Sequence, residues 1–186
     1  MVDLRSAAVP PLSDEDWVRG DPSDPLVIVY ADFTCHECAV AHARLRASAR
    51  PIRWAFRHFA LHSRHPRSVA LACAAEAAGR QGRFWEMHDA LFEDQGHADD
   101  PHLWDRAAAL GLDLDRFEAH RRDPRTAERV RRDVHGGLRA GVSATPTLFI
   151  AGRPHSGAPS AALIDALTTG CTPAAGPTSG PGRPLS

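Results

Sequence analysis

Two cysteines, Cys35 and Cys38, are separated by two residues and follow an apolar run over residues 25–30. The alanine-rich run over 39–46 is typical of a helix. Thiols at such a strand-to-helix junction lie on the first helical turn, where unpaired N–H groups and the positive end of the helix dipole stabilise a thiolate. A stabilised thiolate is the reactive species of thiol–disulfide exchange. The motif therefore predicts redox chemistry.

The order of the two thiols predicts different roles for them. Cys35 is expected to be exposed at the helix start and to act as the nucleophile, with Cys38 partly covered one turn later and acting as the resolving thiol. Two other interpretations stay open, half of a zinc site or a pair of inert core thiols. A zinc site needs a second ligand pair at matched spacing, and Cys73 and Cys171 are single in the sequence.

His36 and Glu37 lie between the thiols and have opposite expected effects on them. An imidazole beside a thiolate stabilises it, more strongly when protonated, whereas a carboxylate raises the pKa of a neighbouring thiol. Because a lower pKa of the nucleophile makes a stronger oxidant, we hypothesise that Glu37 makes the pair less oxidising. The alternative is that Glu37 is solvated and has no effect.

Two further polar positions belong to the predicted site. Asp32 lies three residues before Cys35 and either relays protons to a buried thiol or caps the loop before the helix. Thr145 and Pro146 precede an apolar run over 147–151, and a proline is sterically allowed at the start of a strand because it donates no ladder bond there.

The eleven histidines raise the question of a metal site. His58, His62, His65 and His88 are near one another in sequence, but no HExxH or comparable motif is present. We expect them to be surface or core residues. Cys73, inside an alanine-rich run, is expected to be a small buried residue, and Cys171 is expected to be exposed.

Composition indicates one globular domain with a sizeable core. The 186 residues are 43% hydrophobic and 24% charged, with a net charge of -1, so no polyanionic partner such as nucleic acid is implied. No apolar run approaches the length of a membrane span, and the N-terminus does not resemble a signal peptide. The prediction is a cytoplasmic protein, unless a leader was removed.

The chain predicts a strand, a helix and a strand, then about five helices, and finally two strands and a helix. Residues 1–23 are predicted to form an extended arm with a helical turn over 13–18, and the Gly- and Pro-rich tail over 171–186 to be disordered. The predicted strands are 26–30, 52–59, 147–151 and 155–157. The predicted helices are 35–49, 68–79, 82–95, 101–110, 113–122, 125–140 and 161–169.

Four segments, 27–38, 56–61, 81–92 and 141–150, together resemble the DsbA-like branch of the thioredoxin superfamily. The chain looks closest to domains fused to bacterial sodium/proton antiporters. The resemblance implies an α/β thioredoxin fold with a central mixed sheet, formed by 24–62 and 141–170. Residues 63–140 would be an inserted all-helical subdomain.

The same resemblance implies that the Thr145–Pro146 bond is cis and faces Cys35 and Cys38 across a substrate groove. This sequence departs from the family pattern at His36 and Ala60, where many members carry proline, and at Ala144, where many carry glycine.

The predicted function is that of a thiol–disulfide oxidoreductase acting on protein or low-molecular-weight thiol substrates. A thiol reductant or reductase would be its partner, and no cofactor or metal is expected. One alternative is a glutathione-type transferase or isomerase on the same fold, although such enzymes typically lack the second cysteine. The other is a non-enzymatic redox-sensing or metal-binding domain.

Overall fold

The computed structural model describes residues 8–169, so the predicted tail over 171–186 and Cys171 lie outside the described residues. The strands are β1 (Trp17–Arg19), β2 (Leu26–Ala31), β3 (Arg53–His58), β4 (Thr147–Ile150) and β5 (Arg153–Ser156). The helices are α1 (His36–Arg46), α2 (Ser68–Gly79), α3 (Phe84–Glu93), α4 (Asp100–Ala109), α5 (Leu114–Arg122), α6 (Pro124–Arg139) and α7 (Ala161–Thr169).

The five strands form one mixed sheet in the order β1-β3-β2-β4-β5. β2 and β3 pair in parallel, because α1 connects them as a crossover. β1, β4 and β5 pair antiparallel with their neighbours. This arrangement confirms the predicted thioredoxin fold.

The alternation of side chains along the strands divides the core into two layers. Val27 and Val29 of β2 face a core shared with α1, α3 and α7, whereas Ile28 and Tyr30 face a core that includes Val134 of α6. Both faces of β2 are therefore covered, which explains its uninterrupted apolar sequence.

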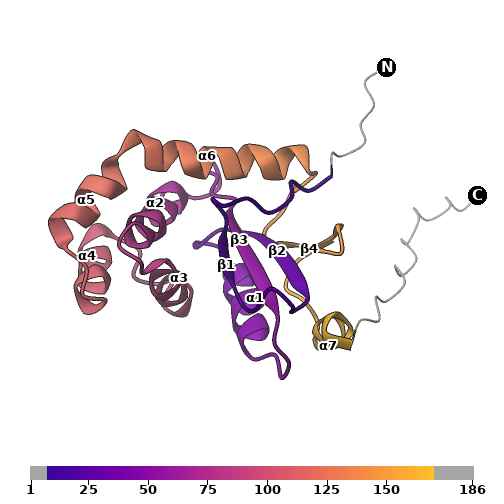
Figure 1. Cartoon of the computed structure of the whole chain (residues 1–186). Helices are drawn as coiled ribbons and strands as arrows, with labels where there is room; N and C mark the ends of the chain where they lie inside the picture. Colours follow the sequence, from indigo (N-terminus) through magenta and orange to yellow (C-terminus); the bar gives the residue numbers. More distant parts are fainter. Residues whose placement is uncertain (1–7, 170–186) are drawn as a thin grey trace, which may run out of the picture.

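Helices α2 to α5 form a group beside the sheet, and α6 runs from this group back across the sheet toward β4 (Figure 1). The α2 helix packs against α3, α5 and α6, which its alanine-rich sequence allows because small side chains let helices approach closely. The helical group thus lies between β3 and β4 in sequence. None of the helices within 8–169 is long and apolar enough to cross a lipid bilayer.

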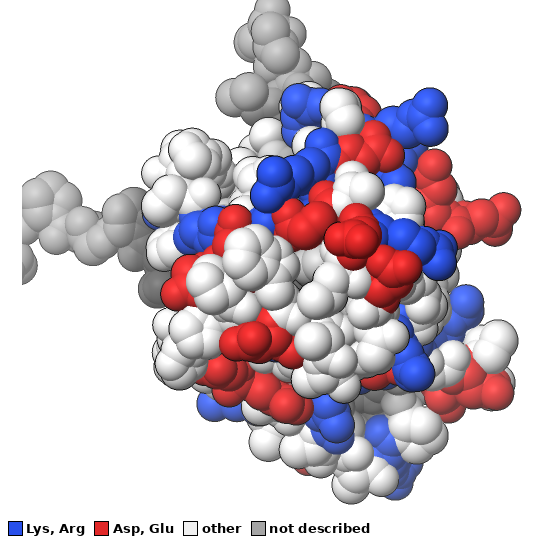
Figure 2. Space-filling model, turned by 90° about the vertical axis from the view of Figure 1, so that its left-hand side faces the viewer, with Lys and Arg blue, Asp and Glu red and all other residues white. Residues whose placement is uncertain are grey.

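Basic and acidic side chains are intermixed over the face formed by the helical group (Figure 2). Arg83 pairs with Glu86 and Arg122 with Glu118 on its surface. Neither sign of charge gathers there into an extended patch of its own (Figure 2).

The N-terminal segment corrects one prediction. The expected helical turn over 13–18 is wrong: a turn closes from Ser13 to Asp16, and Trp17–Arg19 then pairs with β3 as an edge strand. Trp17 stacks on Phe84 with ring centroids 4.3 Å apart, and its Nε1 donates to Glu76 at 2.8 Å. Contacts with residues far along the chain outweigh the weak local helix preference.

Arg57 of β3 attaches the N-terminal segment to the face of the sheet on which Tyr30 lies. Its guanidinium forms two 2.8 Å bonds with the carboxylate of Asp16. It also donates to the carbonyls of Pro10 and Pro11, each at 2.8 Å, and to Tyr30 Oη at 3.2 Å. The side chains of Arg57 and Asp16 are almost fully buried, so both charges depend on this pairing.

We expect Arg57→Ala to lower the free energy of unfolding by about 3–5 kcal/mol, because it leaves the Asp16 carboxylate buried without its partner. Urea unfolding followed by circular dichroism measures the change. Arg83→Ala is the control, since the exposed Arg83–Glu86 pair contributes no more than about 0.5 kcal/mol. Equal unfolding midpoints for the two variants would contradict the prediction.

An apolar cavity of about 370 Å³ lies where the N-terminal segment, the sheet and α7 meet. Val9 lines it from the N-terminal side and Leu167 from α7, with Leu26, Ile28 and Ile150 contributed by the sheet. None of its lining residues lies in the Cys-x-x-Cys segment.

Candidate active site

Cys35 is the N-cap residue of α1, with the extended backbone (φ -90°, ψ 119°) that an N-cap requires. Its own N–H donates to Asp32 O at 3.1 Å, and its carbonyl accepts the Cys38 N–H at 3.0 Å. The thiol is half-buried and free. It lies at the helix start, at the positive end of the helix dipole.

The surroundings of Cys35 lower its pKa from 9.0 to about 6. The largest cause is a hydrogen bond from the thiol of Cys38, and partial burial opposes it. The Thr145 side chain and the N–H groups of Cys38 and Glu37 stabilise the thiolate further. Cys35 is therefore mostly thiolate at neutral pH.

Cys38 has the opposite properties. It lies one turn into α1 with 2% of its surface exposed, and burial, together with the adjacent Cys35, raises its pKa far above the ordinary value. One thiol is thus ionised and accessible, while the other is protonated and covered.

The loop before β4 faces Cys35. The Thr145–Pro146 peptide bond is cis, and the Cys35 thiol lies 3.4 Å from Thr145 O. A groove of about 280 Å³ opens beside Cys35, which we call the Cys35 groove. It is lined by Asp32, Thr34, Cys35, Phe59, Leu61, Arg64, His65, Ser143, Ala144 and Thr145.

The other residues predicted to tune the thiols differ in how far they are buried. His36 and Glu37 are both exposed. The buried Asp32 carboxylate accepts bonds from Thr34 N at 2.9 Å and Thr34 Oγ1 at 2.8 Å. These contacts close the loop before α1, which is the geometry of the capping alternative; the proton-relay role of Asp32 stays a prediction.

One residue beside the site has no counterpart in the sequence predictions. Gln95, in the turn after α3, donates from Nε2 to Phe33 O at 2.8 Å and to Cys35 O at 2.9 Å. No motif or spacing connects a glutamine in the helical group with the cysteines. The contact arises only because folding brings the end of α3 beside the start of α1.

The histidines predicted to be core or surface residues divide between the two. His58 and His88 are buried, and His62 and His65 are exposed. His58 Nε2 lies 2.9 Å from Glu76 Oε1. Cys73 is buried, as expected, and burial raises its pKa to about 11, so its thiol is unreactive.

A cluster of possible metal ligands within 8–169 consists of His42, His88 and Asp89, and it contains neither cysteine of the motif. Asp89 Oδ2 already binds Arg19 at 2.9 Å and Arg46 at 2.6 Å. The two guanidinium groups neutralise the carboxylate, so this cluster does not offer the excess negative charge that would favour a cation.

The fold and the site define a class: a thioredoxin-fold protein with a Cys-x-x-Cys at a helix N-terminus, a cis-proline loop opposite, and a helical insertion. A family model described as thioredoxin matches residues 12–167. The chain belongs to this family.

Curated proteins that match the chain include sodium/proton antiporters. It is 42% identical over 165 residues to the Na(+)/H(+) antiporter NhaA 1 of Salinispora arenicola, covering 87% of this chain and 25% of that protein. It is 38% identical over 171 residues to NhaA of Herminiimonas arsenicoxydans, covering 89% of this chain and 27% of that protein. The chain spans about a quarter of the length of the curated relatives it matches.

Solved structures share the fold. The α-DsbA1 of Wolbachia pipientis superimposes with a TM-score of 0.71 at 24% identity, covering 87% of this chain and 94% of that one. A thioredoxin-like oxidoreductase from Silicibacter pomeroyi gives a TM-score of 0.75 at 21% identity, covering 84% and 92%. These neighbours share the fold that the resemblance of the sequence implies.

Proposed function

We propose that this protein is a thiol–disulfide oxidoreductase whose Cys35–Cys38 pair exchanges electrons with protein substrates. The observation that carries the proposal is the contrast between the two thiols: Cys35 is accessible with a lowered pKa, and Cys38 is buried with a raised one. An inert core pair would lack the accessible thiolate, and the cluster of possible metal ligands described above includes neither thiol.

The exchange begins with attack of the Cys35 thiolate on a substrate disulfide. The substrate S–S bond breaks, one substrate sulfur leaves as a thiolate and takes a proton, and a mixed disulfide joins Cys35 to the other sulfur. Cys38 then loses its proton and attacks Cys35 Sγ, which releases the second substrate thiolate. Two electrons have moved from the Cys35–Cys38 pair to the substrate, and the reverse sequence oxidises a substrate dithiol.

Thr145 lines the Cys35 groove and Pro146 follows it across the cis peptide bond, and we assign both to positioning the substrate beside Cys35. A thiol reductant or a reductase would regenerate the dithiol after each turnover. In a compartment that is kept reducing, such as the cytoplasm, the net direction would be reduction or isomerisation of substrate disulfides.

Reduction of insulin in the presence of excess dithiothreitol tests this function, and equilibration with a glutathione buffer gives the potential. We expect faster insulin reduction than without the protein. A potential near about -120 mV would identify an oxidant and one near about -270 mV a reductant. A protein that neither accelerates insulin reduction nor equilibrates with glutathione would refute the proposal.

The hypothesis about Glu37 gives a separate prediction. Glu37→Ala removes a negative charge beside the thiolate and should raise the reduction potential. The expected rise is about 5–20 mV, which corresponds to the 0.2–1 kcal/mol typical of exposed charge pairs. Glu86→Ala is the control, because Glu86 is also exposed but lies on α3 and pairs with Arg83. An unchanged or lower potential in Glu37→Ala would refute the hypothesis.

A further inference from the structure

The side chain of Gln95 connects the helical group to the segment that carries the nucleophile. α3 ends at Glu93, and the following turn directs Gln95 toward the start of α1. Its single amide nitrogen donates both protons, one to Phe33 O at 2.8 Å and one to Cys35 O at 2.9 Å. One side chain therefore holds two backbone carbonyls on either side of Thr34.

These two carbonyls determine how the segment before α1 is oriented. Each carbonyl lies in a rigid peptide plane, so holding Phe33 O and Cys35 O fixes the planes that flank Thr34 and Cys35. The Cys35 carbonyl also accepts the N–H groups of Cys38 at 3.0 Å and Ala39 at 3.3 Å. The direction of the Cys35 side chain, and its approach to Thr145, depend on this arrangement.

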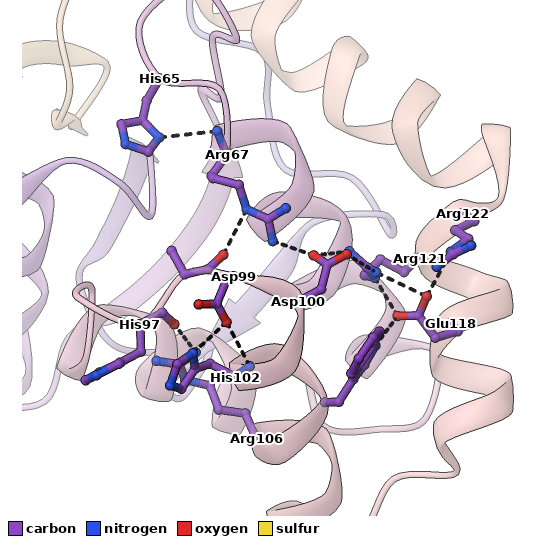
Figure 3. A network of polar contacts seen from close by, with 12 residues as sticks. His65, Arg67, His97, Asp99, Asp100, His102, Arg106, Glu118, Arg121 and Arg122 are labelled. Atoms are coloured by element: carbon purple, nitrogen blue, oxygen red, sulfur yellow. Dashed lines mark hydrogen bonds and ion pairs between the residues drawn. The ribbon is translucent and has the colours of Figure 1, made fainter.

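The turn that carries Gln95 is itself held by arginines of the helical group. Arg106 donates to Asp94 O at 2.7 Å and to His97 O at 2.6 Å, just before and after Gln95. Arg67 donates to Ala98 O at 2.9 Å. Arg67 also pairs with Asp100, which joins it to Arg121 of α5 (Figure 3).

The fixed turn means that Gln95 reaches the site from a rigid support, as a positioning group must. We propose that Gln95 is a positioning residue for disulfide exchange: by holding the carbonyls of Phe33 and Cys35, it fixes the Cys35 sulfur at the helix start beside Thr145. This inference rests on the proposed function. It makes the helical group part of the redox site, because loss of the contact would destabilise the Cys35 thiolate while both cysteine side chains stay unchanged.

Gln95→Met tests the inference, because methionine has a similar length and no N–H donor. Gln95→Glu is a second variant, in which a carboxylate replaces the donor and repels both carbonyls. The measurement is the rate of Cys35 alkylation by iodoacetamide as a function of pH, with the maximal rate of insulin reduction measured alongside.

We expect the alkylation rate of Gln95→Met at about pH 6 to fall about 2–6-fold, as for a rise of about 0.5–1 in the pKa of Cys35 from about 6, and to approach the wild-type rate at about pH 9. Gln95→Glu should show a larger fall in the same direction. A purely structural role would lower the melting temperature and leave the inflection of the pH profile unchanged.

Gln81→Met provides a matched control within the helical group. Gln81 Nε2 donates to Asp113 O at 3.1 Å, and Gln81 Oε1 accepts the Asp113 N–H at 3.0 Å. The variant removes the same kind of amide-to-backbone contact elsewhere in the helical group, and neither of its partners belongs to the site. We expect its pH profile for Cys35 alkylation to match the wild type.

The outcomes separate the two proposals. If wild-type Cys35 ionises near its ordinary pKa and insulin is not reduced, the proposed function fails. If the wild type behaves as proposed but a folded Gln95→Met or Gln95→Glu protein keeps the wild-type pH profile, only the role of Gln95 fails. Because the two variants are measured separately, one that does not fold leaves the other to decide.

Discussion

Replacing Cys35 by serine should lower the rate of insulin reduction to the rate observed without protein. A serine hydroxyl neither ionises near neutral pH nor forms a disulfide, so no mixed disulfide can form. In the proposed function Cys35 is the thiol that meets the substrate, since it lies half-buried at the start of α1. Insulin turbidity, followed with equal protein concentrations, measures the loss.

Cys73→Ala is the matched control for this experiment, since Cys73 is buried in α2 and burial raises its pKa. It should retain the wild-type rate. If Cys35→Ser retained activity while Cys73→Ala lost it, the nucleophile would not be in the Cys-x-x-Cys.

Replacing Cys38 by alanine should raise the pKa of Cys35 from about 6 toward its ordinary value of 9.0. The hydrogen bond from the Cys38 thiol is the largest cause of the lowered pKa, and alanine cannot donate it. The ultraviolet absorbance of the thiolate, titrated in the reduced protein, measures the shift. The variant should also accumulate mixed disulfides, because the resolving thiol is gone.

The lowered pKa of Cys35 also makes the stability of the reduced protein depend on pH. Between pH about 6 and 9 the unfolded reduced chain binds more protons at Cys35 than the folded protein does. The free energy of unfolding contributed by this thiol therefore rises with pH across that window and is lost as the pH falls through about 6. Denaturant unfolding at several pH values should show this rise in the wild type and a smaller one in Cys38→Ala. An identical rise in both proteins would exclude Cys38 as the main source of the shift.

Much of this architecture is predictable because its signals are local. The apolar run of β2, the alanine-rich sequence of α2 and the Cys-x-x-Cys at a helix start each specify their element from neighbouring residues. The predicted boundaries of α1 and α3 extend beyond the observed ones, since helix ends depend on caps and packing rather than on periodicity.

The remainder depends on contacts between distant residues. β1 has three residues and no apolar alternation of its own, and it becomes a strand only by pairing with β3. The lowered pKa of Cys35 depends on Thr145 as well as on its own helix. Gln95 acquires its place from the packing of the helical group. The division at 63–140 and the roles of His36, Glu37 and Asp32 remain predictions.

The cavity between the N-terminal segment and α7 has a consequence for how the domain can be joined to other segments. Val9 and Leu167, at the two ends of the described chain, line the same cavity, and neither lines the Cys35 groove. Both ends of the described chain thus border one apolar cavity beside β2 and β4. A tether attached near Val9 or Leu167 would begin beside this cavity, and neither residue forms part of the surface beside Cys35.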